Sequence, residues 1–161
     1  MSQVDYFLKI DGIPGESGDA KHKDEIHLDS WSWSERQSGS MAEGGGGGAG
    51  KVKMNDFQFS MKVNKASPKL MLACACGDHI KKAVLTCRKA GKHQHDYAII
   101  TFSDLIVSSF STGGSAQGAV PSDAITLNFA AISYQYKEPK ADGSLGAAVQ
   151  TGYDLKKMQA T

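Results

Sequence analysis

The sequence has few aliphatic side chains and almost no net charge. Valine (7), isoleucine (9), leucine (9) and phenylalanine (6) make up only 31 of the 161 residues. Such a low share indicates disorder only when it comes with a high net charge. Here the formal charge is +1, which also gives no support to nucleic-acid binding. The composition favours one folded domain with a thin core, or with apolar surface buried between subunits.

Long hydrophobic runs, a leader segment and a cysteine framework are also missing. The longest apolar run, Leu70–Cys76, is far below the ~18 residues of a membrane span, so no membrane insertion is expected. Asp5 stands early, and no basic stretch precedes a long apolar one, as a secretory signal requires. Three cysteines are too few, and odd in number, for a disulfide framework. We therefore expect a chain made and folded in a reducing cytoplasm.

Most of the chain alternates between apolar and polar residues with the period of two that is typical of β-strands. The clearest run is Phe57–Val63, in which every second residue is apolar. The alternation shifts phase near Ser30, where Trp31 and Trp33 take the opposite parity from the apolar residues before them, which indicates a bulge or a strand covered on both faces. Further runs cover residues 6–10, 26–30, 83–88, 97–102, 105–110, 125–136 and 147–155.

One segment departs from this alternation. Ser67 is a suitable N-cap, and Pro68 suits the first helical turn that follows it. The next seven residues are nearly all apolar, and Gly77 is a natural C-terminal stop. We expect a short helix over residues 68–76. The fold class is therefore mainly β, a β-barrel or sandwich with one short α-helix.

The glycine run Gly44–Gly48, followed by Ala49-Gly50-Lys51, comes close to a phosphate-binding loop. Val52 stands where that motif needs a serine or threonine for magnesium. An alternating strand pattern follows it instead of the helix whose N-terminus would hold a phosphate. A long flexible loop between two strands is the favoured interpretation. A small nucleotide-binding enzyme that uses the Gly44–Lys51 loop is the alternative function.

No residue pattern indicates catalysis, a cofactor or a metal. Cys74 and Cys76 lie two apart on the expected helix and point to nearly opposite sides, so the two thiols and nearby His79 do not make a zinc site. His93 and His95 fall in a polar turn that solvation explains. No serine sits in a nucleophile elbow, and no cysteine has a protease signature. We expect a protein that is not an enzyme and has no cofactor.

An ordered set of short motifs runs through nearly the whole chain. It comprises Asp5–Gly12, Gly15–Ser17, His22, Glu25-Ile26, Ser30–Trp33, Gly39–Met41, Gly50–Val52, Ser67–Met71, Arg88–Gly91, Val107–Ser109, Ser111–Ser115, Ile125–Ala130 and Lys140–Gly143. Together they resemble the haemolysin-coregulated protein (Hcp) family of bacterial type VI secretion. Two stretches depart from its pattern: Gly152-Tyr153-Asp154, where a Gly-Trp pair is expected, and Ala116–Ser122, which is variable.

The resemblance implies a phage-tail-tube-like subunit, with residues 1–161 forming a single Hcp-like tube domain. Six copies would form a homohexameric ring, and rings would stack into the inner tube of the secretion machine. Its partners would be other copies of itself, the type VI spike and sheath proteins, and effector proteins carried in the lumen. The protein would start in the bacterial cytoplasm and be secreted through the type VI system without a signal peptide.

The resemblance and the strand parity together suggest two sets of site residues. Ser30, Ser32 and Ser34 lie on the opposite side of their strand from the two tryptophans, and we expect them to face the lumen and its cargo. The loop over residues 38–50 is expected to contact the next ring. Its ring-stacking residues would be Gly39, Ser40, Met41, Gly44, Gly45, Gly46, Gly47, Gly48 and Gly50.

Overall fold

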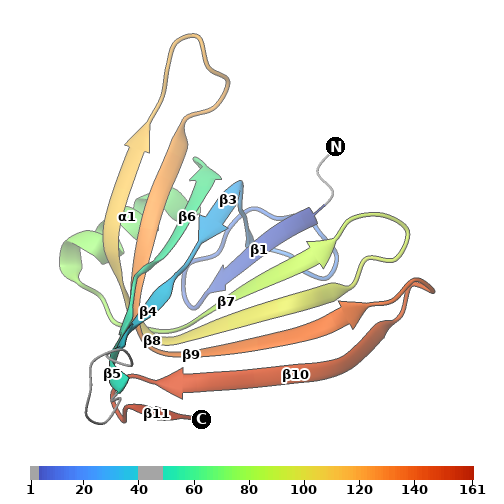
Figure 1. Cartoon of the computed structure of the whole chain (residues 1–161). Coiled ribbons are helices and arrows are strands. Elements are labelled where there is room, and N and C mark those ends of the chain that lie inside the picture. The colour runs from blue at the N-terminus through green and yellow to red at the C-terminus, as the bar shows by residue number, and fades with distance from the viewer. Residues whose placement is uncertain (1–3, 40–48) are drawn as a thin grey trace.

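The computed structural model describes residues 4–39 and 49–161 and is built mainly from β-strands (Figure 1). The strands are β1 (Val4–Ile10), β2 (Ile26–His27), β3 (Ser30–Ser32), β4 (Glu35–Gly39), β5 (Ala49–Met54), β6 (Phe57–Lys62), β7 (Ile80–Lys89), β8 (Asp96–Gly113), β9 (Ser122–Pro139), β10 (Leu145–Asp154) and β11 (Gln159–Ala160). One helix, α1 (Ala66–Cys76), lies between β6 and β7. The mainly-β prediction is confirmed. No helix among the described residues is long and apolar enough to cross a membrane.

The strands form one curved antiparallel sheet and a separate two-stranded hairpin. The main path runs β11-β10-β9-β8-β7-β1-β2, and β6 joins β9 on one side and β3 on the other. The long strand β9 therefore serves two arms, because its first half pairs with β6 and its second half pairs with β10. Strand β8 runs beside it along almost its whole length. The sheet does not close into a barrel, so the sandwich-like form of the prediction describes the fold.

The segment 26–32 joins the two arms of the sheet. Leu28 donates its backbone N–H to the Tyr6 carbonyl in β1, and the next residue, Asp29, donates to the Ser60 carbonyl in β6. The chain thus changes pairing partner between β2 and β3. This change explains the phase shift that the sequence shows near Ser30.

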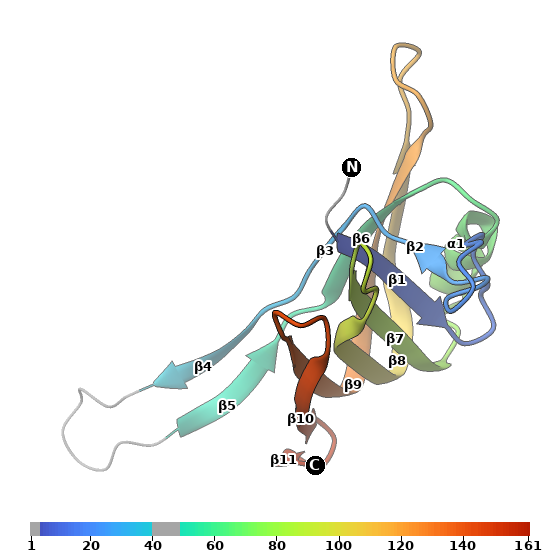
Figure 2. The same ribbon diagram turned by 90° about the vertical axis from the view of Figure 1, so that its right-hand side faces the viewer.

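Two hairpins project from the body of the molecule. One is the upper part of β8 and β9, and the other is β4–β5, which extends on the side opposite α1 (Figure 2). Two predicted runs, 97–102 and 105–110, are parts of the single strand β8, and Asp104 between them has a left-handed backbone conformation with φ 52°. The predicted loop over residues 38–50 is shorter than expected, because Gly39 pairs with Ala49 across β4 and β5.

Helix α1 begins two residues earlier than predicted, and Ser67 is not its N-cap. Lys65 holds that position, and the Asn64 side chain accepts a hydrogen bond from the Ala66 N–H at 2.8 Å. The Ser67 hydroxyl instead donates to the buried carboxylate of Asp123, 2.5 Å away. The predicted C-terminal stop is confirmed, since Gly77 is left-handed with φ 64°. Leu70 is buried against the sheet and anchors the helix there.

The core lies between the sheet arms and beneath α1. Phe57 and Phe102 are fully buried with ring centroids 4.6 Å apart, and Phe129 packs on Phe102 at 4.9 Å. Trp31 and Trp33 are partly buried against this cluster, as predicted for the core side of their strand. Alternate residues of β3 therefore face solvent. This arrangement positions the serines considered next.

Candidate functional site

Ser30, Ser32 and Ser34 are all exposed and lie on the side of their strand away from Trp31 and Trp33. The strand parity inferred from the sequence is thus confirmed. Ser30 and Ser60 hydroxyls lie 2.5 Å apart across the β3–β6 ladder. One step along the ladder, Ser32 is the direct cross-strand neighbour of Gln58. The serines of β3 therefore continue into a polar surface on β6.

Strands β9 and β8 extend this surface. Thr126 pairs with Gln58 across β6 and β9, and its hydroxyl lies 2.7 Å from that of Ser108 and 2.5 Å from that of Ser109. Two adjacent serines reach one threonine because the β8–β9 register shifts between Val107 and Ser109. We call this surface the hydroxyl face. Its members are Ser30, Ser32, Ser34, Gln58, Ser60, Ser108, Ser109, Ser111 and Thr126.

Two shallow hollows lie along the hydroxyl face. They have volumes of about 390 and 620 Å³, and Ser32, Gln58 and Thr126 line both of them. Asp56 at the edge of the second hollow accepts hydrogen bonds from Ser108 (2.6 Å) and Asn128 (2.8 Å). Its carboxylate is therefore already occupied by donors. The face is dominated by neutral hydrogen-bonding groups, which suits contact with polar protein surface.

Ser32 and Gln58, at the centre of the hydroxyl face, have side chains that are available for hydrogen bonds to another molecule. No hydrogen bond joins either side chain to another residue in the ranges 4–39 and 49–161. Most of the other hydroxyls are paired with one another, Ser34 accepts a hydrogen bond from the Asn55 amide at 2.7 Å, and Ser111 donates to the Ala124 carbonyl at 3.2 Å. Together Ser32 and Gln58 present a hydroxyl and a carboxamide, each of which donates and accepts hydrogen bonds.

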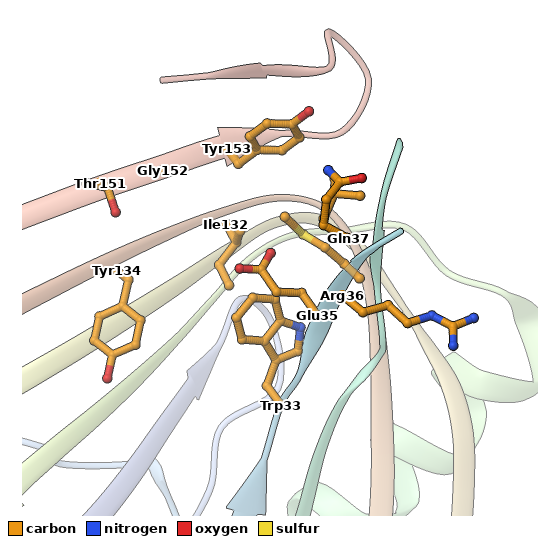
Figure 3. Close-up of a pocket in the computed structure, with 11 residues that line it drawn as sticks. Trp33, Glu35, Arg36, Gln37, Ile132, Tyr134, Thr151, Gly152 and Tyr153 are labelled. Atoms are coloured by element: carbon orange, nitrogen blue, oxygen red, sulfur yellow. The ribbon is translucent and has the colours of Figure 1, made fainter. Parts of the chain in front are cut away.

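A separate cleft lies between the β4–β5 hairpin and strands β9 and β10 (Figure 3). Its volume is about 480 Å³. The Trp33 indole and the side chains of Ile132 and Tyr134 face it, whereas the Arg36 guanidinium points away (Figure 3). Trp33 is held by a hydrogen bond from its Nε1 to the Asn55 carbonyl at 2.9 Å. The cleft is mainly apolar, and Glu35 is its acidic lining residue.

Two of the nine expected ring-stacking residues lie among the described residues. Gly39 ends β4 and Gly50 lies in β5. The remaining seven, Ser40, Met41, Gly44, Gly45, Gly46, Gly47 and Gly48, lie outside the described residues. Lys51 continues strand β5, so the segment after the glycine run is a strand. A phosphate-binding loop needs a helix at this place, and the nucleotide-binding alternative lacks that support.

The cysteines and histidines do not assemble into a metal centre in the part of the chain that the structure describes. Cys74 is partly buried and Cys76 is exposed, in line with their predicted divergence on the helix. Cys87 is buried in β7, and burial raises the pKa of its thiol to about 11. Such a thiol stays protonated at neutral pH and is a poor nucleophile or metal ligand.

Sequence reasoning missed most of the hydroxyl face. Gln58 and Ser60 could have been found from parity, because they alternate with the buried Phe57, Phe59 and Met61. Ser109 and Thr126 could not have been found in this way, because only the pairing of β8, β9 and β6 brings them beside β3.

Comparison with known proteins identifies the family. Residues 7–136 match the family model described as "Type VI secretion system effector, Hcp". Protein hcp1 of Pseudomonas aeruginosa is 48% identical over 155 residues, covering 95% of this chain and 96% of that protein. The crystal structure of Hcp1 from Salmonella typhimurium has a TM-score of 0.83 at 38% identity and covers 99% of this chain and 100% of that one. A type VI secretion system effector from Yersinia pestis has a TM-score of 0.72 at 31% identity, with coverages of 93% and 99%.

The motif set, the sandwich-like β-fold with one helix and these similarities agree along nearly the whole chain. Members of this family are tube proteins of type VI secretion, which assemble with copies of themselves and are secreted. The chain belongs to the Hcp family of the type VI secretion system.

Proposed function

We propose that the chain is a single tube domain over residues 1–161 that forms a homohexameric ring, and that its rings stack into the inner tube and carry effectors in the lumen. The observation that supports cargo carriage best is the hydroxyl face. It is exposed, neutral and extended over four strands, with the aromatic core directly behind it. A wall of this kind binds polar protein surface through hydrogen bonds without large charge effects.

On this proposal Ser30, Ser32 and Ser34 face the lumen, together with Gln58 and Thr126. Ser32 and Gln58 make the direct contacts with cargo, because their side chains have no hydrogen-bond partner among the described residues. The other hydroxyls shape the surface around them. Ring closure requires a heterologous contact between two different surfaces of each subunit.

Ring stacking is assigned to Gly39–Gly50 at the end of the projecting β4–β5 hairpin. The support for this assignment is that strands β4 and β5 project away from the main sheet (Figure 2). Ordering a glycine-rich segment costs roughly 1 kcal/mol or more per residue. Stacking is therefore weak and concentration-dependent, and it is assisted by spike and sheath proteins. The tube is assembled in the bacterial cytoplasm and exported through the type VI system.

Negative-stain electron microscopy and light scattering of the purified protein test the ring directly. Six-membered rings with a matching mass are expected, and a monomer across micromolar concentrations would refute the ring. Shortening Gly44–Gly48 should leave the rings intact and impair tube growth and secretion. Tubes of normal length from the shortened protein would exclude the stacking role.

Cargo binding is tested with Ser32→Arg and Gln58→Leu, using a co-expressed type VI effector as the probe. Both variants should keep the ring and retain less effector in a pull-down. Gln94→Arg, at an exposed position in the β7–β8 turn, is the matched control and should retain the effector fully. Unchanged retention by the first two variants would remove the hydroxyl face from the lumen.

A further inference from the structure

The segment that connects β1 to β2 is held in place by two buried basic side chains. It runs over residues 11–25, and its anchors are His22, with 6% of its surface exposed, and Arg88 in β7, with 4% exposed. Both pack on the Phe7 ring. The His22 imidazole stacks on it with centroids 4.5 Å apart and planes 9° from parallel, and the Arg88 guanidinium carbon lies 4.8 Å from its centroid.

Both ring nitrogens of His22 contact carboxylates. Nδ1 lies 3.0 Å from Glu25 Oε2, and Nε2 lies 3.1 Å from Asp96 Oδ1 at the start of β8. An ionised carboxylate only accepts hydrogen bonds, and a neutral imidazole carries one N–H. Only the imidazolium form therefore satisfies both contacts. Deprotonation removes one of these two hydrogen bonds. Because the ring is buried, no water molecule can replace the lost bond.

The charged groups around His22 come from every element packed against it. Glu25 and Asp19 belong to the segment itself, and Asp19 Oδ1 accepts the His22 backbone N–H at 3.1 Å. From the strands come Asp96 of β8, Arg88 of β7 and Asp5 of β1. Arg88 bonds Asp19 at 2.7 Å and Asp5 at 3.2 Å, and His27 lies 3.6 Å from Asp5.

These groups leave the surroundings of His22 rich in carboxylates. Arg88 neutralises Asp19 and Asp5 directly, while Glu25 and Asp96 bond to the imidazole itself. Burial lowers the pKa of His22, but the hydrogen bonds and charges of Asp96 and Glu25 outweigh it, so the pKa is raised above its ordinary value of 6.5.

The same segment also reaches helix α1. Glu16 Oε2 accepts the backbone N–H of Lys65, the N-cap residue, at 2.8 Å. Gly15 beside it packs against the Glu25 backbone so tightly that a β-carbon would lie 2.5 Å from the carbonyl oxygen. Movement of Glu25 away from His22 is therefore passed to Gly15 and Glu16, and from there to the start of the helix.

We propose that His22 is a pH-dependent lock: its imidazolium form clamps residues 11–25 between β8 and α1, and its neutral form releases this segment and the Glu16 contact to the helix. The lock is closed while the imidazole of His22 is protonated, and it opens as the pH rises through the pKa of His22. It does not depend on ring formation or on cargo.

Two NMR measurements on the folded wild-type protein test the lock. The side-chain signals of His22 should titrate with a midpoint above 6.5. Amide exchange, corrected for intrinsic base catalysis, should show the protection of residues 12–25 falling about tenfold per pH unit between pH ~6.5 and that midpoint. The Lys65 amide should follow the same curve, while amides in the centres of β7 and β8 should not.

His22→Gln keeps a polar side chain of similar size without the titration. Its segment amides should have low protection at all pH values, and the Lys65 amide should share this loss. His79→Gln, at an exposed histidine, should behave as wild type. A His22 midpoint at or below 6.5 would overturn the proposal. So would protection of residues 12–25 and Lys65 that does not change with pH, or that falls equally throughout β7 and β8. The titration of the wild-type protein tests the proposal by itself, even if a variant fails to fold.

Discussion

Gly15 and the Glu25 backbone are in contact at a distance that only glycine permits, since a β-carbon on Gly15 would also lie 2.8 Å from the Glu25 carbonyl carbon. Gly15→Ala should therefore force the two backbone segments apart and lower the free energy of unfolding by roughly 1–3 kcal/mol. Urea unfolding measures this as a shift in midpoint. Gly18→Ala is the matched control, because a β-carbon there meets no atom within 4 Å. Equal midpoints for the two variants would contradict the contact.

Arg88→Leu should be among the most destabilising single substitutions. It leaves Asp5 and Asp19 without the cation that bonds both of them, and it also removes the contact with Phe7. Breaking a buried ion pair by removing one partner costs about 3 kcal/mol. Thermal and urea unfolding would measure the loss. Arg36→Leu, on the exposed β4 strand, should change stability by no more than about 0.5 kcal/mol, and a similar effect of both variants would argue against the ion pairs.

Asp19 should contribute to the stability of the protein in acid. The hydrogen bond from the Arg88 side chain holds the pKa of Asp19 below its ordinary value of 3.8. A group whose pKa is lowered by folding adds stability that is fully present above about pH 3.8 and is lost as the pH falls through the lowered pKa. Urea midpoints measured between pH 5 and pH 2.5 should therefore fall less steeply for Asp19→Asn than for wild type. Parallel curves would show that Asp19 is not involved.

The three cysteines should react in order of exposure. Cys76 is exposed, Cys74 is partly buried, and Cys87 is buried with its pKa raised to about 11. Because the thiolate is the reactive form, iodoacetamide at pH 8 should label Cys76 first and Cys87 only after unfolding. Peptide mass spectrometry identifies the labelled positions. Labelling of Cys87 in the native protein at the rate of Cys76 would contradict its burial.

Local patterns in the sequence were sufficient for most of the longer strands and for the side of β3 that faces solvent, but not for β4, whose five residues are all exposed and show no alternation. The alternation of Phe57–Val63 places Phe57, Phe59 and Met61 in the core, as the structure confirms. The start of α1 was predicted wrongly because Ser67 is a good N-cap in isolation, whereas in the fold its hydroxyl bonds Asp123, 56 residues away. Tertiary pairing overrides the local preference there.

Local sequence preference was also insufficient to predict the His22 contacts and the hydroxyl face. His22 and Asp96 are 74 residues apart, and no local motif relates them. The hydroxyl face likewise depends on register: Thr126 lies beside Gln58 only because β9 pairs with β6 at that offset. Residue types and parity therefore predict which side chains are exposed, while the pairing of distant strands decides which of them meet.

The pairing of β1 also has a consequence for synthesis of the chain. Val4–Ile10 pairs along its whole length only with Ala83–Lys89, so during synthesis this strand has no more than its short ladder with Ile26–His27 until the later segment exists. Meanwhile β7, β8, β9 and β10 are consecutive antiparallel neighbours joined by short turns and close quickly. The meander thus folds first and the N-terminal strand is added late. Until then Phe7, Leu8 and Ile10 remain uncovered, and the nascent chain is open to chaperones and to aggregation over that interval.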